Sequence, residues 1–269
     1  MIWLISYDDG NIESYASLTR NNKIEYAERR GYRYLLTQGK NREEPKLSPP
    51  WCLVGTIRQS LGMASEGDWI CLTGADSCVV NMDFDLEDLI ATYSTKWKDP
   101  PTDHPDLLIT RDKCGLNTNG ILLRNCEWSR ELIERWWMMR GPLYEVVGLD
   151  NTHHWWAEQA ALVYLLNEPG FTGRVFPERD GVHGVEPMPD VAQRIAFIPQ
   201  ETTNGYDPRI YGDDYKEPIL IAHYPGKQTE ERTYFIKRAL GLVTQRPLPE
   251  GYWVDGEDKV RPPQPPPHA

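Results

Sequence analysis

Apolar stretches of strand length alternate with helix-forming stretches through the first half of the chain, and this alternation constrains the fold more than any other feature. We predict strands and helices in turn at residues 2–7, 14–30, 32–36, 51–63 and 69–72. Gly31 ends the first helix, and Pro49 and Pro50 open the second. Repeated strand–helix–strand units build a mostly parallel sheet with helices on both faces, so we expect an α/β fold.

The later part of the chain carries the same signals at less regular intervals. We predict helices at 86–93, 127–139 and 155–166, and strands at 107–110, 120–124, 195–198 and 219–223. Residues 1–245 are expected to form one domain. Residues 246–269 form a proline-rich tail that lacks apolar periodicity, and we expect its last ten or so residues to be extended or disordered.

The composition is that of a globular protein with an acidic balance. The chain has 269 residues and a formal charge of −11, which argues against binding a nucleic-acid backbone through bulk charge but leaves a local basic groove open. The five cysteines form no CxxC pair, so we expect buried free thiols in a reducing compartment. We find no signal peptide and no apolar run of membrane-spanning length, and therefore expect a cytoplasmic protein without membrane contact.

One aspartate stands just beyond a predicted buried strand, in the stretch WICLTGADSCVVN. Asp76 follows the strand at 69–72, and ligands of open α/β sheets bind beyond the carboxyl ends of the strands. Because a buried and unpaired carboxylate is costly, we expect Asp76 to have a partner, a metal ion or an exit to solvent. Aspartate is also common in turns, and the pattern alone leaves a turn-capping role equally open.

A histidine and a lysine close the last predicted strand, in the stretch LIAHYPGK. On its own, the pattern favours His223 as a hydrogen-bonded strand-end residue, and the alternative is a neutral imidazole that is the second ligand of a metal. A divalent cation at this place would neutralise charge on a sugar diphosphate, and Lys227 would add to that effect.

Two further stretches carry polar side chains suited to a sugar. Glu158 and Gln159 begin a predicted helix, where the helix dipole by itself also favours an acidic residue. Asn117, Thr118 and Asn119 in GLNTNGILLRN suit sugar hydroxyls, but the pattern alone favours a turn.

Other patterns narrow the class of protein. The paired tryptophans at 136–137 and 155–156 fit stacking on sugar rings or, more commonly, burial in the core. The chain has no GxGxxG after its first strand, no Walker loop, no GxSxG and no HExxH. These absences argue against dinucleotide oxidoreductases, P-loop enzymes, serine hydrolases and zinc proteases.

Seven stretches, taken in order, resemble the galactosyl/mannosyl/xylosyltransferase family of fungal Golgi and plant xyloglucan enzymes. NNKIEYAERRGYRYLL is similar to N-R-x-x-Y-A-x-x-H-G-Y, SPPWCLVGTIRQSL to P-x-W-x-K, and DWICLTGADSCVVN to W-I-W-x-x-D-A-D-x-x-x-x-N. GLNTNGILLRNCEWSRELIERWW is similar to G-L-N-x-G-x-F-L-I-R-N-x-x-W-S. AEQAALVYLL, FIPQETTNGY and AHYPGK resemble an acidic-Gln-x-A-L helix, V-P-Q-x-x-x-N-S-Y and H-F-x-G-C-K. The resemblance spans about residues 1 to 240 and implies a GT-A fold that binds nucleotide sugars.

The resemblance also implies a divalent metal on the diphosphate of the donor, usually Mn²⁺, with Mg²⁺ as the alternative. Asp76 and His223 correspond to two of the metal ligands. Gly74 stands where the family has the first of its two aspartates, so Gly74→Asp is expected to tighten metal binding. Leu53 stands where the family has a lysine that contacts the donor.

Residues around the donor and the reacting sugar follow from the same resemblance. The residues expected at the donor are Asp76, Ser77, Asn117, Asn119 and Lys227, the last displaced by one position from the family lysine. Family enzymes retain the anomeric configuration, and Gln159 corresponds to their glutamine at the reacting face of the sugar. Because an amide is a poor nucleophile, we expect the leaving diphosphate to accept the acceptor's proton, while Gln159 and Glu158 stabilise positive charge on the sugar ring.

We therefore expect a retaining glycosyltransferase that moves a hexose or pentose from a UDP- or GDP-sugar to a glycan or another hydroxyl acceptor. One alternative is sugar transfer to hydroxymethylated bases of viral DNA, against which the acidic charge argues. The other is a degenerate domain that binds a sugar or nucleotide without catalysis, which Gly74 favours.

Overall fold

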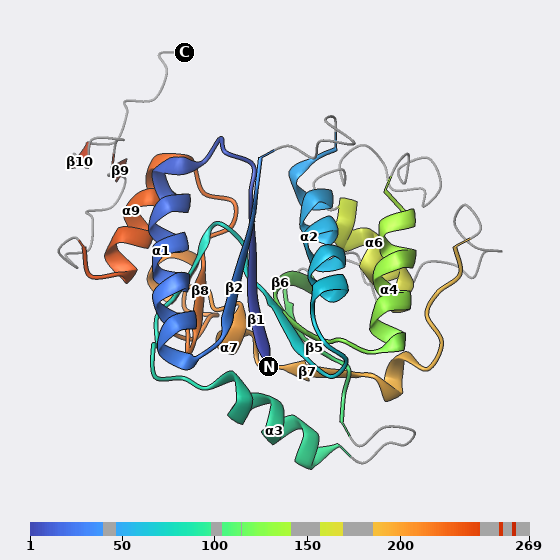
Figure 1. Cartoon of the computed structure of the whole chain (residues 1–269). Coiled ribbons are helices and arrows are strands. Elements are labelled where there is room, and N and C mark those ends of the chain that lie inside the picture. Colours follow the sequence, from blue (N-terminus) through green and yellow to red (C-terminus); the bar gives the residue numbers. More distant parts are fainter. Residues whose placement is uncertain are drawn as a thin grey trace.

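The computed structural model describes residues 1–39, 47–97, 104–113, 115–140, 157–168 and 185–242, and the short pieces 253–254 and 260–261. Their centre is a six-stranded sheet in the order β2-β1-β3-β6-β5-β7 (Figure 1). The strands are β1 (Ile2–Asp8), β2 (Arg33–Gln38), β3 (Trp69–Leu72), β5 (Leu107–Asp112), β6 (Gly115–Arg124) and β7 (Ile195–Ile198). β6 runs antiparallel to its neighbours β3 and β5, whereas the other pairs are parallel. The predicted mostly parallel sheet is confirmed.

Helices cover both faces of this sheet, as predicted. The longer ones are α1 (Glu13–Arg30), α2 (Pro49–Met63), α3 (Leu86–Lys96), α4 (Glu127–Met138), α6 (Ala157–Leu165) and α9 (Thr229–Ala239). α2, α4 and α6 pack together on one face, and α1 lies on the other with α9 beside it (Figure 1). Trp3 and Ile5 of β1 join the core under α2 and α4, whereas Ile2 and Leu4 join the core under α1 and α3. Burial on both faces explains why β1 is apolar without alternation.

The predicted ends of the first two helices are confirmed. Gly31 ends α1 in the left-handed conformation with a φ of 71°, which a residue without a Cβ adopts at little cost. Pro49 occupies the first position of α2, where the N–H that proline lacks would have no partner within the helix.

The asparagine-rich stretch is a strand, and its interpretation as a turn is wrong. β6 begins at Gly115 rather than at residue 120, because its backbone continues to pair with β5 as far as Asp112 opposite Gly115. The polar side chains do not prevent this pairing, since they find hydrogen-bond partners outside the ladder.

A second, two-stranded sheet brings distant parts of the chain together. β4 (Ser77–Val79) pairs antiparallel with β8 (Ile221–His223), with Ser77 opposite His223. Cys78 and Ala222 of this pair share a buried cluster with Tyr15 of α1 and Ile236 of α9. The turn after β3, which carries Asp76, is therefore held beside the end of β8.

Short helical segments complete the described fold. They are η2 (Val191–Gln193), α7 (Gln200–Thr203) and α8 (Pro208–Tyr211). In the predicted tail, β9 (Trp253–Val254) and β10 (Val260–Arg261) pair antiparallel. The rest of 246–269 lies outside the described residues, so an extended or disordered tail stays a prediction.

Several smaller predictions can be compared with the described residues. Trp136 and Trp137 are buried in the core, whereas the pair at 155–156 lies outside the described residues. The cysteines among the described residues are buried and free, as predicted, and Cys114 lies outside them. Within the part of the chain that the structure describes, no helix combines the length and apolar character needed to cross a bilayer.

Candidate functional site

A cleft of about 580 Å³ opens at the carboxyl ends of β3 and β5. Leu72 ends β3 and Asp112 ends β5, and both lie in the wall of the cleft, where α/β sheets bind their ligands. Of the residues predicted for a site, the cleft brings together Asp76, Asn117, Asn119, Glu158, Gln159 and His223.

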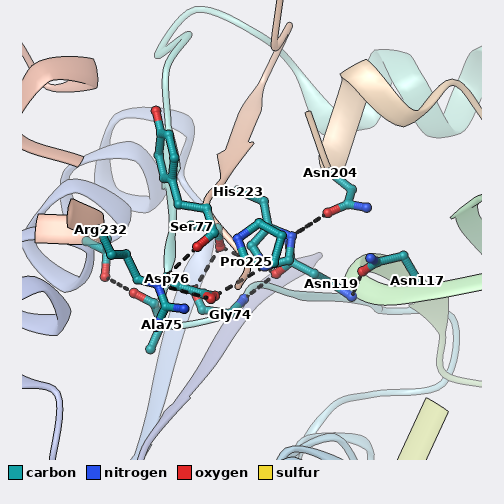
Figure 2. A network of polar contacts seen from close by, with 12 residues as sticks. Gly74, Ala75, Asp76, Ser77, Asn117, Asn119, Asn204, His223, Pro225 and Arg232 are labelled. Carbon is teal, nitrogen blue, oxygen red and sulfur yellow. Dashed lines mark hydrogen bonds and ion pairs between the residues drawn. The ribbon is translucent and has the colours of Figure 1, made fainter. Parts of the chain in front are cut away.

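Asp76 and His223 face each other at one end of this cleft (Figure 2). Asp76 Oδ1 lies 3.3 Å from His223 Nε2, and Asp76 Oδ2 lies 3.8 Å from Nε of Arg232 on α9. Burial acts to raise the pKa of Asp76, but the facing His223 and Arg232 outweigh it and hold the pKa below its ordinary value of 3.8. Asp76 is therefore a carboxylate at neutral pH, and its partners are a histidine and an arginine.

A hydrogen bond orients the imidazole ring of His223. Its Nδ1 lies 2.6 Å from Oδ1 of Asn204, which follows α7. When Nδ1–H donates to this oxygen, Nε2 faces Asp76 and is free to hold either a proton or a metal ion, as in histidines that bind metals. Among the described residues, no three His, Cys, Asp or Glu side chains gather as a metal site. The pair that could hold a divalent ion is Asp76 and His223, whose facing atoms are 3.3 Å apart.

Polar side chains hold the turn before Asp76 from two sides. Asn119 Oδ1 of β6 accepts the N–H of Gly74 at 2.6 Å, and Nζ of Lys23 on α1 donates to the carbonyl of Gly74 at 2.5 Å. The hydroxyl of the buried Ser77 donates to the same carbonyl at 2.8 Å, so Ser77 shapes the turn. Burial lowers the pKa of Lys23 to about 8. The sequence pattern does not indicate a role for Lys23, because lysine in a helix is ordinarily exposed.

Glu158 presents a buried carboxyl group in the cleft wall at the start of α6. Its Oε1 accepts a hydrogen bond from the hydroxyl of Thr118 at 3.2 Å, while Oε2 has no hydrogen-bond partner among the described residues. Burial raises the pKa of Glu158 above its ordinary value of 4.5, and this effect exceeds the opposing effect of its hydrogen bonds. The free oxygen suits a hydrogen bond with a bound ligand. Gln159 lies beside it in the same wall.

Aromatic residues that sequence analysis missed form another part of the wall. Asp112 Oδ2 accepts hydrogen bonds from Tyr206 and Asn117, both at 2.8 Å. The ring centroid of Tyr206 lies 5.1 Å from those of Tyr211 and Tyr215, and all three tyrosines line the cleft. Tyr206 belongs to the FIPQETTNGY motif, but the segment after it has no periodicity that would predict a common wall.

A family assignment follows from comparison with known proteins. Residues 4–170 match the galactosyl transferase GMA12/MNN10 family, and this region is more than half of the chain. The chain belongs to this family. Asp76, Glu158 and Gln159 lie within the matched region, whereas His223 and Lys227 lie beyond its end.

Plant proteins of related sequence align with parts of this family member. Probable glycosyltransferase 7 of Oryza sativa is 27% identical over 184 residues, which are 61% of this chain and 38% of that protein. Probable xyloglucan 6-xylosyltransferase 5 of Arabidopsis thaliana is 28% identical over 164 residues, which are 57% of this chain and 35% of that protein. The matched regions thus span little more than a third of these relatives.

A solved structure supports the fold of this family member. A glycosyltransferase involved in the glycosylation of the major capsid of PBCV-1 superposes with a TM-score of 0.59 and 17% sequence identity. The superposition covers 88% of this chain and 98% of that chain. The predicted GT-A-like α/β fold is therefore confirmed.

Besides Gly74, two positions where the family member departs from the sequence pattern lie at or beside the cleft. Leu53 is part of the cleft wall. Lys227 follows Gly226 of the wall, and its Nζ lies 5.0 Å from the ring centroid of Tyr211. The cation of Lys227 is thus placed beside the aromatic part of the wall.

Proposed function

We propose that this family member is a retaining glycosyltransferase that moves a hexose or pentose from a UDP- or GDP-sugar to a hydroxyl group of a glycan or another acceptor. The observation that carries the proposal is the composition of the cleft. A carboxylate–histidine pair, Asp76 and His223, shares one cleft with the acid–amide pair Glu158 and Gln159. Such a cleft offers one place for a charged diphosphate and another for the hydroxyls of a sugar.

A divalent ion, Mn²⁺ or alternatively Mg²⁺, is part of the proposal. Asp76 and His223 would hold it, and it would supply positive charge to the leaving diphosphate. The orientation of His223 by Asn204 supports this role, because it directs Nε2 toward Asp76. A proton and a metal ion compete for Nε2 of His223, so metal binding should weaken as the pH falls.

The residues at the sugar have separate roles in this proposal. The amide oxygen of Gln159 and the carboxyl group of Glu158 face the ring and stabilise the positive charge that develops on it. The diphosphate oxygen released from the sugar accepts the proton of the acceptor hydroxyl on the same face, so the anomeric configuration is retained. A hexose or a pentose agrees with the galactosyl transferases of the family and with the Arabidopsis xylosyltransferase.

A thermal-shift screen tests the donor proposal. UDP, GDP and their sugars are added to the full chain with Mn²⁺ or with EDTA, since a ligand raises the melting temperature in proportion to RT ln(1 + [L]/Kd). We expect stabilisation by one nucleotide series, and we expect it to be larger with Mn²⁺. The preferred donor is then incubated with acceptors, and NMR of the product should show the donor's anomeric configuration. An inverted product, or a protein that ignores every nucleotide, would contradict the proposal.

A further inference from the structure

The space next to Gly74 is filled by side chains from elsewhere in the chain. A Cβ at this position would lie 2.8 Å from Asp76 Oδ1 and 2.9 Å from Asn119 Oδ1, closer than carbon and oxygen atoms pack (Figure 2). Gly74 is absent from the glycines with a positive φ, so its backbone would accept another residue. The neighbouring side-chain oxygens, rather than the backbone conformation, restrict what can stand here, and a larger residue needs them to move.

Asn119 is rigidly held in this space. Its side chain is 7% exposed, and its Oδ1 accepts the N–H of Gly74 at 2.6 Å. Its Nδ2 donates to Asn204 Oδ1 at 3.4 Å, the same oxygen that lies 2.6 Å from Nδ1 of His223. One network of amide groups therefore positions both Asn119 and the imidazole of His223.

This contact joins two positions at which the chain departs from the family pattern. In the family pattern W-I-W-x-x-D-A-D, an aspartate stands at the position of Gly74, and in G-L-N-x-G a glycine stands at the position of Asn119. In this chain, glycine replaces the aspartate at position 74, and asparagine replaces the glycine at position 119. Because a Cβ at position 74 would lie 2.9 Å from Asn119 Oδ1, the two positions face each other, and the oxygen beside position 74 is supplied here from β6.

We propose that Asn119 Oδ1 is the third protein ligand of the divalent cation, beside Asp76 Oδ1 and His223 Nε2. This inference rests on the metal in the proposed function. One lone pair of Asn119 Oδ1 accepts the N–H of Gly74, and the other faces the Ser77 hydroxyl at 3.4 Å, whose single hydrogen is donated at 2.8 Å to the Gly74 carbonyl. This second lone pair can therefore turn to a cation, and amide oxygens are accepted ligands of hard cations. Since the amide is neutral, the site has one negative charge fewer than a site with two aspartates. Binding of the cation should therefore depend strongly on the diphosphate of the donor.

If Asn119 is a metal ligand, Gly74→Asp should affect metal binding differently from what the family pattern alone implies. With Asn119 in place, the new side chain has no room, so the single substitution should fail to tighten metal binding. The double variant Gly74→Asp/Asn119→Ala removes the contact with the amide and leaves only the Asp76 side chain to rotate away, so it should bind the metal more tightly than Gly74→Asp alone. Asn119→Ala alone should weaken it by about 10-fold or more. Asn119→Asp adds a charge with little change in shape and should tighten it.

Calorimetric titration of the full chain with Mn²⁺, at saturating UDP and at saturating GDP, measures these effects. Asn21→Ala, an exposed position on α1, is the matched control and should leave the Mn²⁺ affinity unchanged. The inference would be overturned if Asn119→Ala bound Mn²⁺ with wild-type affinity. It would also be overturned if Gly74→Asp alone tightened Mn²⁺ binding. If Asn119→Ala does not fold, the Asn119→Asp variant decides, because a lack of tightening there overturns the inference as well.

The same titration separates this inference from the proposed function. A wild-type protein that binds nucleotide and Mn²⁺ but is insensitive to position 119 leaves the glycosyltransferase proposal standing and removes Asn119 from the site. A wild-type protein that binds neither nucleotide nor Mn²⁺ overturns both.

Discussion

At the scale of single residues, Glu158 holds a carboxyl group where burial disfavours its charge. An acid whose pKa is raised by folding stabilises the protein fully below its ordinary pKa of 4.5, and this stabilisation is lost as the pH rises through the higher pKa of the folded state. The neutral and similarly shaped Glu158→Gln should avoid this loss. We therefore expect the free energy of unfolding of the variant to increase relative to the wild type between pH 4.5 and pH 8, by about 1.4 kcal/mol for each unit by which folding raises the pKa of Glu158. Its melting temperature should rise accordingly.

Melting curves of the two proteins at pH 4.5, 6 and 8 check this prediction, because titrations elsewhere in the molecule cancel in the difference. The same variant should also release UDP or GDP from a nucleotide sugar more slowly in turnover, since an amide stabilises positive charge on the sugar ring less well than a carboxyl group. A melting-temperature difference that stays constant with pH would mean that Glu158 is not strained by its burial.

Several site residues were predictable from the sequence, whereas their contacts were not. Asp76 and His223 lie in motifs with polar residues at strand ends, and the structure pairs them as expected. The contact of Asn119 with Gly74 could not be predicted, because a sequence pattern gives the residue type but not the volume around it. The role of Lys23 could not be predicted for a similar reason, since its burial depends on how α1 packs on the turn after β3.

At the scale of elements, the approach of β6 to α7 positions one side of the cleft. Gly120 of β6 has a φ of +74°, and a Cβ on it would lie 2.0 Å from the carbonyl oxygen of Thr203, which ends α7. In Gly120→Ala, the left-handed backbone conformation of the alanine costs about 1–2 kcal/mol. The collision of its Cβ with the carbonyl oxygen of Thr203 costs about 1–3 kcal/mol more. We expect a loss of about 3 kcal/mol in the free energy of unfolding by urea.

Gly10→Ala is the matched control for this substitution. Gly10 has a φ of +81°, but no heavy atom lies within 4 Å of its added Cβ, so only the backbone strain applies. If the two alanine variants lose the same stability, the close contact of β6 with α7 is not a constraint on the fold. A separation of β6 from α7 should also weaken nucleotide-dependent Mn²⁺ binding, because Asn204 follows α7 and orients His223.

The main elements were predictable where their periodicity was strong. The predicted strands of the first half and the helices between them are present, and β1 pairs with both β2 and β3 as parallel units require. The pairing of β4 with β8 was not predictable, because β4 is a short strand directly after a turn and its partner lies far away in the sequence. That unpredicted pair is what places His223 against Asp76.

At the scale of the whole molecule, the cleft is assembled from segments that are distant in the sequence. The turn after β3, the start of β6, the start of α6 and the end of β8 each supply part of its wall. The family match and the solved glycosyltransferase fix the fold in which these segments meet. The chemistry proposed for the cleft depends on all of them together, so it is best tested by turnover in the intact chain.

Release of free UDP or GDP from a nucleotide sugar, with Mn²⁺ and an acceptor present, tests the central proposal most directly. We expect the wild type to release the nucleotide, and we expect Gln159→Ala to slow release by roughly 100-fold while leaving nucleotide binding intact. His223→Ala should abolish the dependence on Mn²⁺, and Gln193→Ala, at an exposed position of η2, should behave as the wild type. Tight binding of a nucleotide sugar without any release of UDP or GDP would contradict the proposal and favour a binding domain that does not catalyse transfer.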